Sequence, residues 1–138
     1  MNYYQVKLIK NLSALNKFFL WLAIIWTGIV TYFCMIDSDD IPVLPNNFDK
    51  LGHISFHFGI TTLWFLYFNY RKSNNQIIRK ALLKAFLFSF TYGIIIEICQ
   101  GVLTDSRTAD IFDVMANTIG ASLAVITILF ITRTRKKE

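Results

Sequence analysis

Four polar residues stand where an apolar run begins: Asp49, Lys50, His53 and His57. Lys50, His53 and His57 are spaced by three and four residues, so a helix through this stretch places them on one face. A histidine in such a place can transfer a proton or bind a metal ion. The structural alternative makes Asp49 a helix cap and Lys50 an anchor whose charged end reaches the membrane interface.

A second pair, Glu97 and Gln100, lies three residues apart near the end of a later apolar run. An ionisable group costs about 2.5–3.5 kcal/mol at the centre of a membrane helix, so it is a candidate functional residue by default. A carboxylate and an amide on one stripe could hold a cation, accept a proton or bind a hydroxyl group of a ligand. The alternative is a lone glutamate that is simply protonated.

The third group is Arg107, Asp110, Asp113 and Asn117, spaced by three, three and four residues. If this stretch is helical, all four side chains point one way, and Gly120 continues the stripe, where it would allow a neighbouring helix to approach closely. The alternative is a solvated loop with a local Arg–Asp pair. The unbroken spacing favours a shared site.

Together these groups supply the candidate ligand-binding residues Asp49, Lys50, His53, Glu97, Gln100, Arg107, Asp110, Asp113 and Asn117. If the protein is an enzyme, Glu97 and His53 are the candidate general acid and base. A divalent cation is an open alternative, with His53, Glu97, Asp110 and Asp113 as its candidate ligands. The H-E-x-x-H zinc signature is absent, and no serine or cysteine has a base adjacent in sequence.

Four apolar runs must position these residues: 18–36, 54–70, 85–103 and 114–132. Each is close to the length that crosses a hydrocarbon core of roughly 30 Å as a helix. The chain has 138 residues, of which 54% are hydrophobic, so we predict one all-α domain, an integral membrane four-helix bundle over residues 1–138. Cys34 and Cys99 both lie in apolar runs, which favours buried thiols over a disulfide framework.

Lysine and arginine give the bundle a direction. Twelve of the fourteen lie in the amino-terminal arm, the middle loop or the tail, and Lys50 and Arg107 are the other two. By the positive-inside rule both termini are cytoplasmic, and all three polar groups face outward. The same clustering argues against a nucleic-acid partner. We expect residues 1–17 to form an arm in the cytoplasmic interface or a frayed beginning of the first helix, while the long apolar run argues against a cleaved signal peptide.

Three segments carry a resemblance to a known family: Asp49–Phe58, Glu97–Gln100 and Arg107–Gly120. They resemble the VanZ-like family, whose members read roughly D-K-x-x-H-x-x-x-[FY], E-x-x-Q and R-x-x-D-x-x-D-x-x-x-N-x-x-G. His57 departs from this pattern, since the family often has an aromatic residue there. The resemblance implies a protein of the bacterial inner (cytoplasmic) membrane that acts at the cell envelope. One member is associated with low-level teicoplanin resistance, but the family implies no reaction.

Three functions fit these observations. In the first, an outward-facing pocket binds a lipid-linked or amphiphilic ligand, such as a cell-wall precursor or a glycopeptide, with Lys50 and Arg107 contacting anionic oxygens. In the second, the protein is an intramembrane hydrolase or transferase that acts on a lipid headgroup. In the third, the polar network only holds the bundle together, each interhelical hydrogen bond contributing roughly 0.6–2 kcal/mol. A homo-oligomer or another membrane protein as partner is left open.

Overall fold

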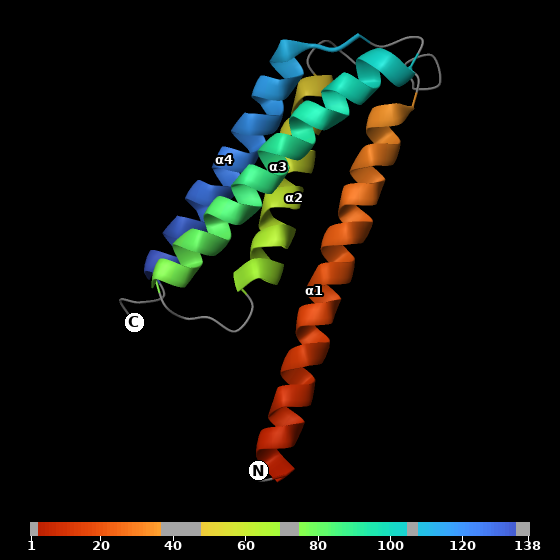
Figure 1. Ribbon diagram of the computed structural model, residues 1–138. Coiled ribbons are helices and arrows are strands. Elements are labelled where there is room, and N and C mark those ends of the chain that lie inside the picture. Colours follow the sequence, from red (N-terminus) through yellow and green to blue (C-terminus); the bar gives the residue numbers. More distant parts are fainter. Residues whose placement is uncertain (1–2, 37–47, 70–74, 105–107, 135–138) are drawn as a thin grey trace.

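The computed structural model describes residues 3–36, 48–69, 75–104 and 108–134, and this part of the chain contains four α-helices and no strand (Figure 1). The helices are α1 (Tyr3–Met35), α2 (Phe48–Asn69), α3 (Asn75–Leu103) and α4 (Ile111–Thr134). The predicted all-α fold is confirmed. Neither cysteine forms a disulfide; Cys34 is buried, as expected, and Cys99 is only partly buried.

Each helix begins before the apolar run that predicted it. Helix α2 begins at Phe48, six residues before the predicted start at residue 54. Helix α3 begins at Asn75, ten residues before the predicted start at residue 85. The reason is that hydrophobicity marks only the part of a helix that suits hydrocarbon, whereas backbone hydrogen bonding continues through polar residues at the ends. Asp49, Lys50 and His53 are therefore helical, in the first two turns of α2.

Three stretches of the described chain are long and apolar enough to cross a membrane: Ala14–Met35, Gln76–Leu103 and Ile111–Thr134. Helix α2 has 22 residues and rises about 33 Å, but its polar residues lower its mean hydropathy. It packs against α1, α3 and α4. The polar residues His53, His57 and Thr61 are buried in this packing, so they face protein and not lipid.

The bundle has two distinct ends (Figure 1). At the end that we call the termini end, α1 and α3 begin and α2 and α4 finish; at the opposite end, which we call the polar end, α1 and α3 finish and α2 and α4 begin. The described basic residues of α3 and α4, such as Arg79 and Arg133, lie toward the termini end. This arrangement fits the predicted topology, while the side of the membrane that each end faces stays a prediction.

Helix α1 runs without a break from Tyr3 to Met35 and extends beyond the other helices at the termini end (Figure 1). Its 33 residues amount to about 50 Å, more than a bilayer core requires. The amino-terminal arm and the first span are thus one helix. Whether the arm lies in the membrane interface stays a prediction.

Small residues bring α2 and α4 together. A Cβ atom on Gly120 would collide with the backbone carbonyl oxygen of Ile54 and lie 2.9 Å from its carbonyl carbon. Ala116, Ala121 and Ala124 of α4 are also buried. The predicted close approach at Gly120 is confirmed, and it is the contact that sets the distance between the two helices.

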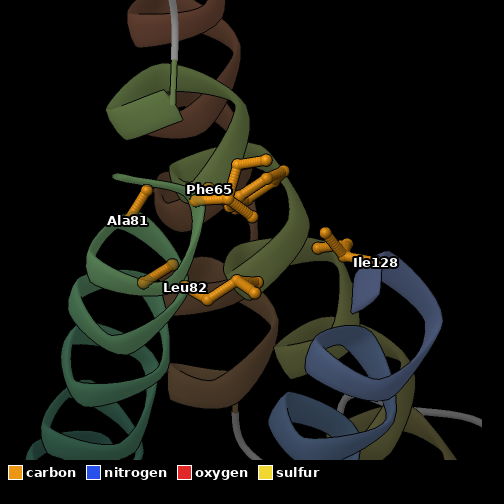
Figure 2. Close-up of a cluster of buried hydrophobic side chains, with 6 residues drawn as sticks. Phe65, Ala81, Leu82 and Ile128 are labelled. Carbon is orange, nitrogen blue, oxygen red and sulfur yellow. The ribbon is translucent and has the colours of Figure 1, made fainter. Parts of the chain in front are cut away.

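Two apolar clusters complete the core. Figure 2 shows the one near the termini end, where Phe65 of α2 meets Ala81 and Leu82 of α3 and Ile128 of α4. The second cluster joins α1 to α2 and α3 through Val30, Cys34, Ile60 and Ile96. Large apolar side chains such as Trp21, Ile126 and Phe130 are exposed, as expected for helices that face lipid.

Candidate functional site

Lys50 connects α2 to the beginning of α4 at the polar end. Its ammonium Nζ donates hydrogen bonds to Asp113 Oδ1 at 2.9 Å and to Asp110 Oδ2 at 3.1 Å. The same ammonium lies 5.7 Å from the centre of the Phe112 ring, within range of a cation–π contact. Lys50 is therefore paired with two carboxylates of the protein, and its contact with anionic oxygens of a ligand stays a prediction.

Asp110 does not continue the helical stripe predicted from its spacing. It immediately precedes α4 and acts as its cap: Oδ1 accepts the Phe112 N–H at 2.8 Å, and its carbonyl oxygen accepts the Asp113 N–H at 3.0 Å. The first N–H groups of a helix have no partner within the helix, and an aspartate before it satisfies them. Asp110 and Asp113 thus meet at Lys50, although only Asp113 lies within α4.

Hydrogen bonding explains the charge states of this pair outside the apolar spans. The Phe112 N–H, and after it the Lys50 ammonium, hold the pKa of Asp110 below its usual value. The hydrogen bonds to Asp113 and Asp110 raise the pKa of Lys50. Both groups are therefore charged across the neutral range.

His53 is the buried centre of the cluster. Its Nδ1 lies 3.0 Å from Asn117 Oδ1, which can only accept, so Nδ1 carries the hydrogen in this contact. On the other side of the ring, Nε2 lies 3.8 Å from Asp49 Oδ1 and 3.9 Å from Asp113 Oδ2. With Nδ1 directed at Asn117, Nε2 and the two carboxylates face one another and can together act as ligands of a cation.

Asp49, His53 and Asp113 can hold that cation, because each offers one ligand atom and these atoms all lie within 4.8 Å of one another. Two ligands bonded at about 2.1 Å to one ion lie at most about 4.2 Å apart. Both carboxylate distances from Nε2 fall within this limit, and small side-chain rotations would bring the whole set to bonding distance. A histidine that ligates through one nitrogen usually donates its other N–H to an acceptor, as Nδ1 does to Asn117. Three protein ligands would leave coordination positions open.

This set differs from the predicted metal ligands. His53 and Asp113 belong to it, but Glu97 and Asp110 do not, and Asp49 replaces them. The reason is that Asp110 is used as a cap and partner of Lys50, while Asp49 lies one turn before His53 on α2, where their side chains meet.

Glu97 brings a third helix, α3, to this cluster of α2 and α4 residues, and it is 3% exposed. Its Oε2 accepts the backbone N–H of Asp110 at 3.2 Å. Its Oε1 has no hydrogen-bond partner within the described part of the chain, and it lies 4.0 Å from His53 Nδ1. Glu97 thus fixes the start of α4 with one oxygen and leaves the other unpaired beside the histidine.

Gln100 does not join the described cluster. The Gln100 amide donates to the carbonyl oxygen of Cys34 at 2.8 Å, which ties α3 to the end of α1. Arg107 lies outside the described residues. The backbone of α1 thus receives Gln100, although the described residues of this helix supply no group to the Lys50–His53 cluster.

His57 forms a separate polar contact deeper in the bundle. Its Nδ1 lies 2.9 Å from Ser89 Oγ of α3, and both residues are buried. Sequence reasoning did not single out Ser89, because a serine in an apolar run is common. The available signal was its position midway along a helix that packs against the helix carrying His57. Gly93 makes room for this contact, because a Cβ atom there would lie 2.9 Å from His57 Cε1 and 3.1 Å from Asn117 Nδ2.

The described part of the cluster contains more acidic than basic side chains. Among the described residues it holds four carboxylates, those of Asp49, Glu97, Asp110 and Asp113, and a single lysine. A divalent cation would offset part of this excess. A cation therefore fits the cluster better than an isolated anionic group does.

The comparison with protein families gives one match. A family model described as VanZ/LLP1 matches residues 4–132, nearly the whole chain. The chain belongs to the VanZ/LLP1 family. Searches of curated proteins and of solved structures found no match. Membership confirms the resemblance, and together with the three apolar helices it identifies a VanZ-like membrane protein.

Proposed function

We propose that this VanZ-like protein acts at the bacterial cell envelope, in the cytoplasmic membrane, and binds a lipid-linked or amphiphilic ligand at its outward-facing polar cluster. A cell-wall precursor or a glycopeptide has the required chemistry, with a polar headgroup joined to an apolar chain. A divalent cation held by Asp49, His53 and Asp113 would present positive charge to oxygens of that headgroup.

The observation that carries the proposal is the environment of His53 Nε2. It faces two carboxylates, at 3.8 and 3.9 Å, while Nδ1 is fixed by Asn117. Lys50, already bonded to Asp110 and Asp113, holds α2 and α4 in place around this point. Because the charge of Lys50 is already paired with these two carboxylates, a metal ion is the better partner for an anionic headgroup.

The surroundings of the cluster suit an amphiphile. Leu51, Ile111, Phe112 and Met115 are each more than half exposed and lie beside the polar residues on α2 and α4. In a bilayer these side chains would lie beside the part of the acyl chains nearest the headgroups, so a ligand could place its headgroup at the cluster and keep its chain in the lipid. Contiguous polar and apolar surface of this kind is typical of a site for a lipid.

The arrangement of Glu97 favours a second candidate, a metal-assisted hydrolase or transferase acting on a lipid headgroup. Its unpaired Oε1 lies 4.0 Å from His53 Nδ1, so a carboxylate without a hydrogen-bond partner stands beside the candidate metal ligands. A cation held by Asp49, His53 and Asp113 would supply a water of lowered pKa. In hydrolysis, Glu97 would take a proton from this water as its oxygen bonds to phosphorus, and would pass that proton to the leaving oxygen as the old bond to phosphorus breaks.

Binding of a polyprenyl phosphate to the purified protein in mixed micelles tests the first proposal. We expect saturable binding that requires a divalent cation and weakens at least tenfold in Asp113→Asn. His57→Phe is the matched control, because it removes a histidine of α2 that lies outside the cluster, and it should bind as the wild type does. Equal binding with and without chelator, or an equal loss in both variants, would reject the proposal. Release of inorganic phosphate in the same samples would favour the enzyme.

A further inference from the structure

A groove on the lipid-facing side of α3 and α4 lies outside the polar cluster. Its volume is about 560 Å³, and it opens near the termini end of the bundle. Its walls are formed mainly by apolar side chains of the two helices, namely Leu82, Leu83, Phe86, Val125, Ile126 and Leu129. Leu82 also belongs to the core cluster of Figure 2, so the bottom of the groove is firmly packed.

Two arginines border the groove, Arg79 near the beginning of α3 and Arg133 near the end of α4. Both are exposed, and neither forms an ion pair with another described residue. The described carboxylates lie toward the other end of the bundle, around Lys50. Two guanidinium groups over an apolar groove complement a phosphate joined to a hydrocarbon chain, since the planar donors of arginine match phosphate oxygens.

The length of the groove also fits a lipid. Along α4 it extends from Ser122 to Arg133, eleven residues or about 16 Å of rise. Half of a hydrocarbon core of roughly 30 Å is about 15 Å. The groove therefore spans the depth of one leaflet, with its charged end where the headgroups lie.

We infer that this groove binds one anionic phospholipid, with its phosphate between Arg79 and Arg133 and an acyl chain along the apolar walls. The inference is independent of the proposed function, because it uses neither the polar cluster nor a metal ion. A second copy of this chain or another helix is the competing occupant. A phospholipid is favoured because the charges sit at one end only and the remainder of the groove is apolar.

The test compares phosphatidylglycerol with phosphatidylcholine of identical acyl chains, added to the purified protein and measured by native mass spectrometry. We expect preferential retention of phosphatidylglycerol, and about a 30-fold weaker affinity in the Arg79→Gln/Arg133→Gln variant, from roughly fivefold per basic residue. Lys80→Gln/Lys84→Gln is the matched control, since it removes the same charge from α3 outside the groove. It should retain most of the preference.

A second variant tests the apolar part without changing charge. Ser122→Phe places a ring in the groove and should weaken the retention of phosphatidylglycerol and phosphatidylcholine alike, while soluble glycerol phosphate should not compete in the wild type. The inference is overturned if the two lipids are retained equally, if the lysine variant loses as much as the arginine variant, or if Ser122→Phe has no effect. A dimer that excludes lipid from the groove would also overturn it.

Discussion

Replacement of Gly120 by alanine tests how the site is positioned. The new Cβ atom would collide with the carbonyl oxygen of Ile54 and lie 2.9 Å from its carbonyl carbon, whereas carbon and oxygen normally stay about 3.3 Å or more apart. Helices α2 and α4 must then separate by roughly 1 Å. Overpacking of this kind costs about 1–3 kcal/mol.

The same shift should disrupt the cluster. His53 precedes Ile54 on α2, and Asn117 lies one turn from Gly120 on α4, so their 3.0 Å hydrogen bond would lengthen beyond bonding range. We therefore expect Gly120→Ala to lower both the free energy of unfolding and the affinity for a divalent cation. Loss of a hydrogen bond to a metal-binding histidine typically weakens metal affinity 10–100-fold.

The assay is unfolding in detergent micelles followed by tryptophan fluorescence, together with Mn²⁺ binding. Gly28→Ala in α1 is the matched control, because a Cβ atom there would meet nothing within 4 Å. It should leave both properties unchanged or slightly improve stability, as expected for glycine to alanine in a helix. Equal stability and equal Mn²⁺ affinity in the two variants would show that the contact between Gly120 and Ile54 does not position the site.

Three further predictions follow from the site. Glu97→Gln should keep the fold, measured by thermal unfolding, but abolish any hydrolysis of a lipid headgroup; full activity in a folded variant would exclude Glu97 as the base. Ser89→Ala should destabilise the bundle by about 1–3 kcal/mol, because it leaves Nδ1 of buried His57 without its partner, and Ser89→Thr should recover part of this loss if the hydroxyl matters. The pKa of Asp110 is lowered in the fold, so its stabilising effect is present above the usual aspartate pKa of about 3.9 and is lost as the pH falls through the lower, folded value. The stability difference between wild type and Asp110→Asn should therefore be constant from pH 5 to 8 and vanish in strong acid; a difference that persists there would contradict this origin.

The sequence predicted the helices well because apolar runs report directly on burial in hydrocarbon. Their boundaries were less accurate where polar residues at a helix end remain helical, as at Asp49 and Lys50. It also placed three polar groups at one end of the bundle, and the structure brings Lys50, His53 and Glu97 together there. These predictions depended on spacing along one helix and on topology, both of which a sequence contains.

Contacts between helices could not be predicted in the same way. Periodicity gives the face of a helix on which Gln100 lies, but not the rotation that turns this face toward the carbonyl of Cys34. Nor does it reveal that Asp110 would serve as a cap and so leave Asp49 to complete the candidate metal ligands. Such choices depend on which donors remain unpaired once the helices pack, a property of the whole bundle.

We propose that His53 Nε2, Asp49 and Asp113 hold a divalent cation. Pulsed electron paramagnetic resonance of Mn²⁺ added to the purified protein detects a directly coordinated nitrogen. We expect a nitrogen coupling in the wild type and in His57→Phe that disappears in His53→Gln, with Mn²⁺ affinity at least tenfold lower in Asp113→Asn. No nitrogen coupling in the wild type, or a coupling that survives in His53→Gln, would contradict it.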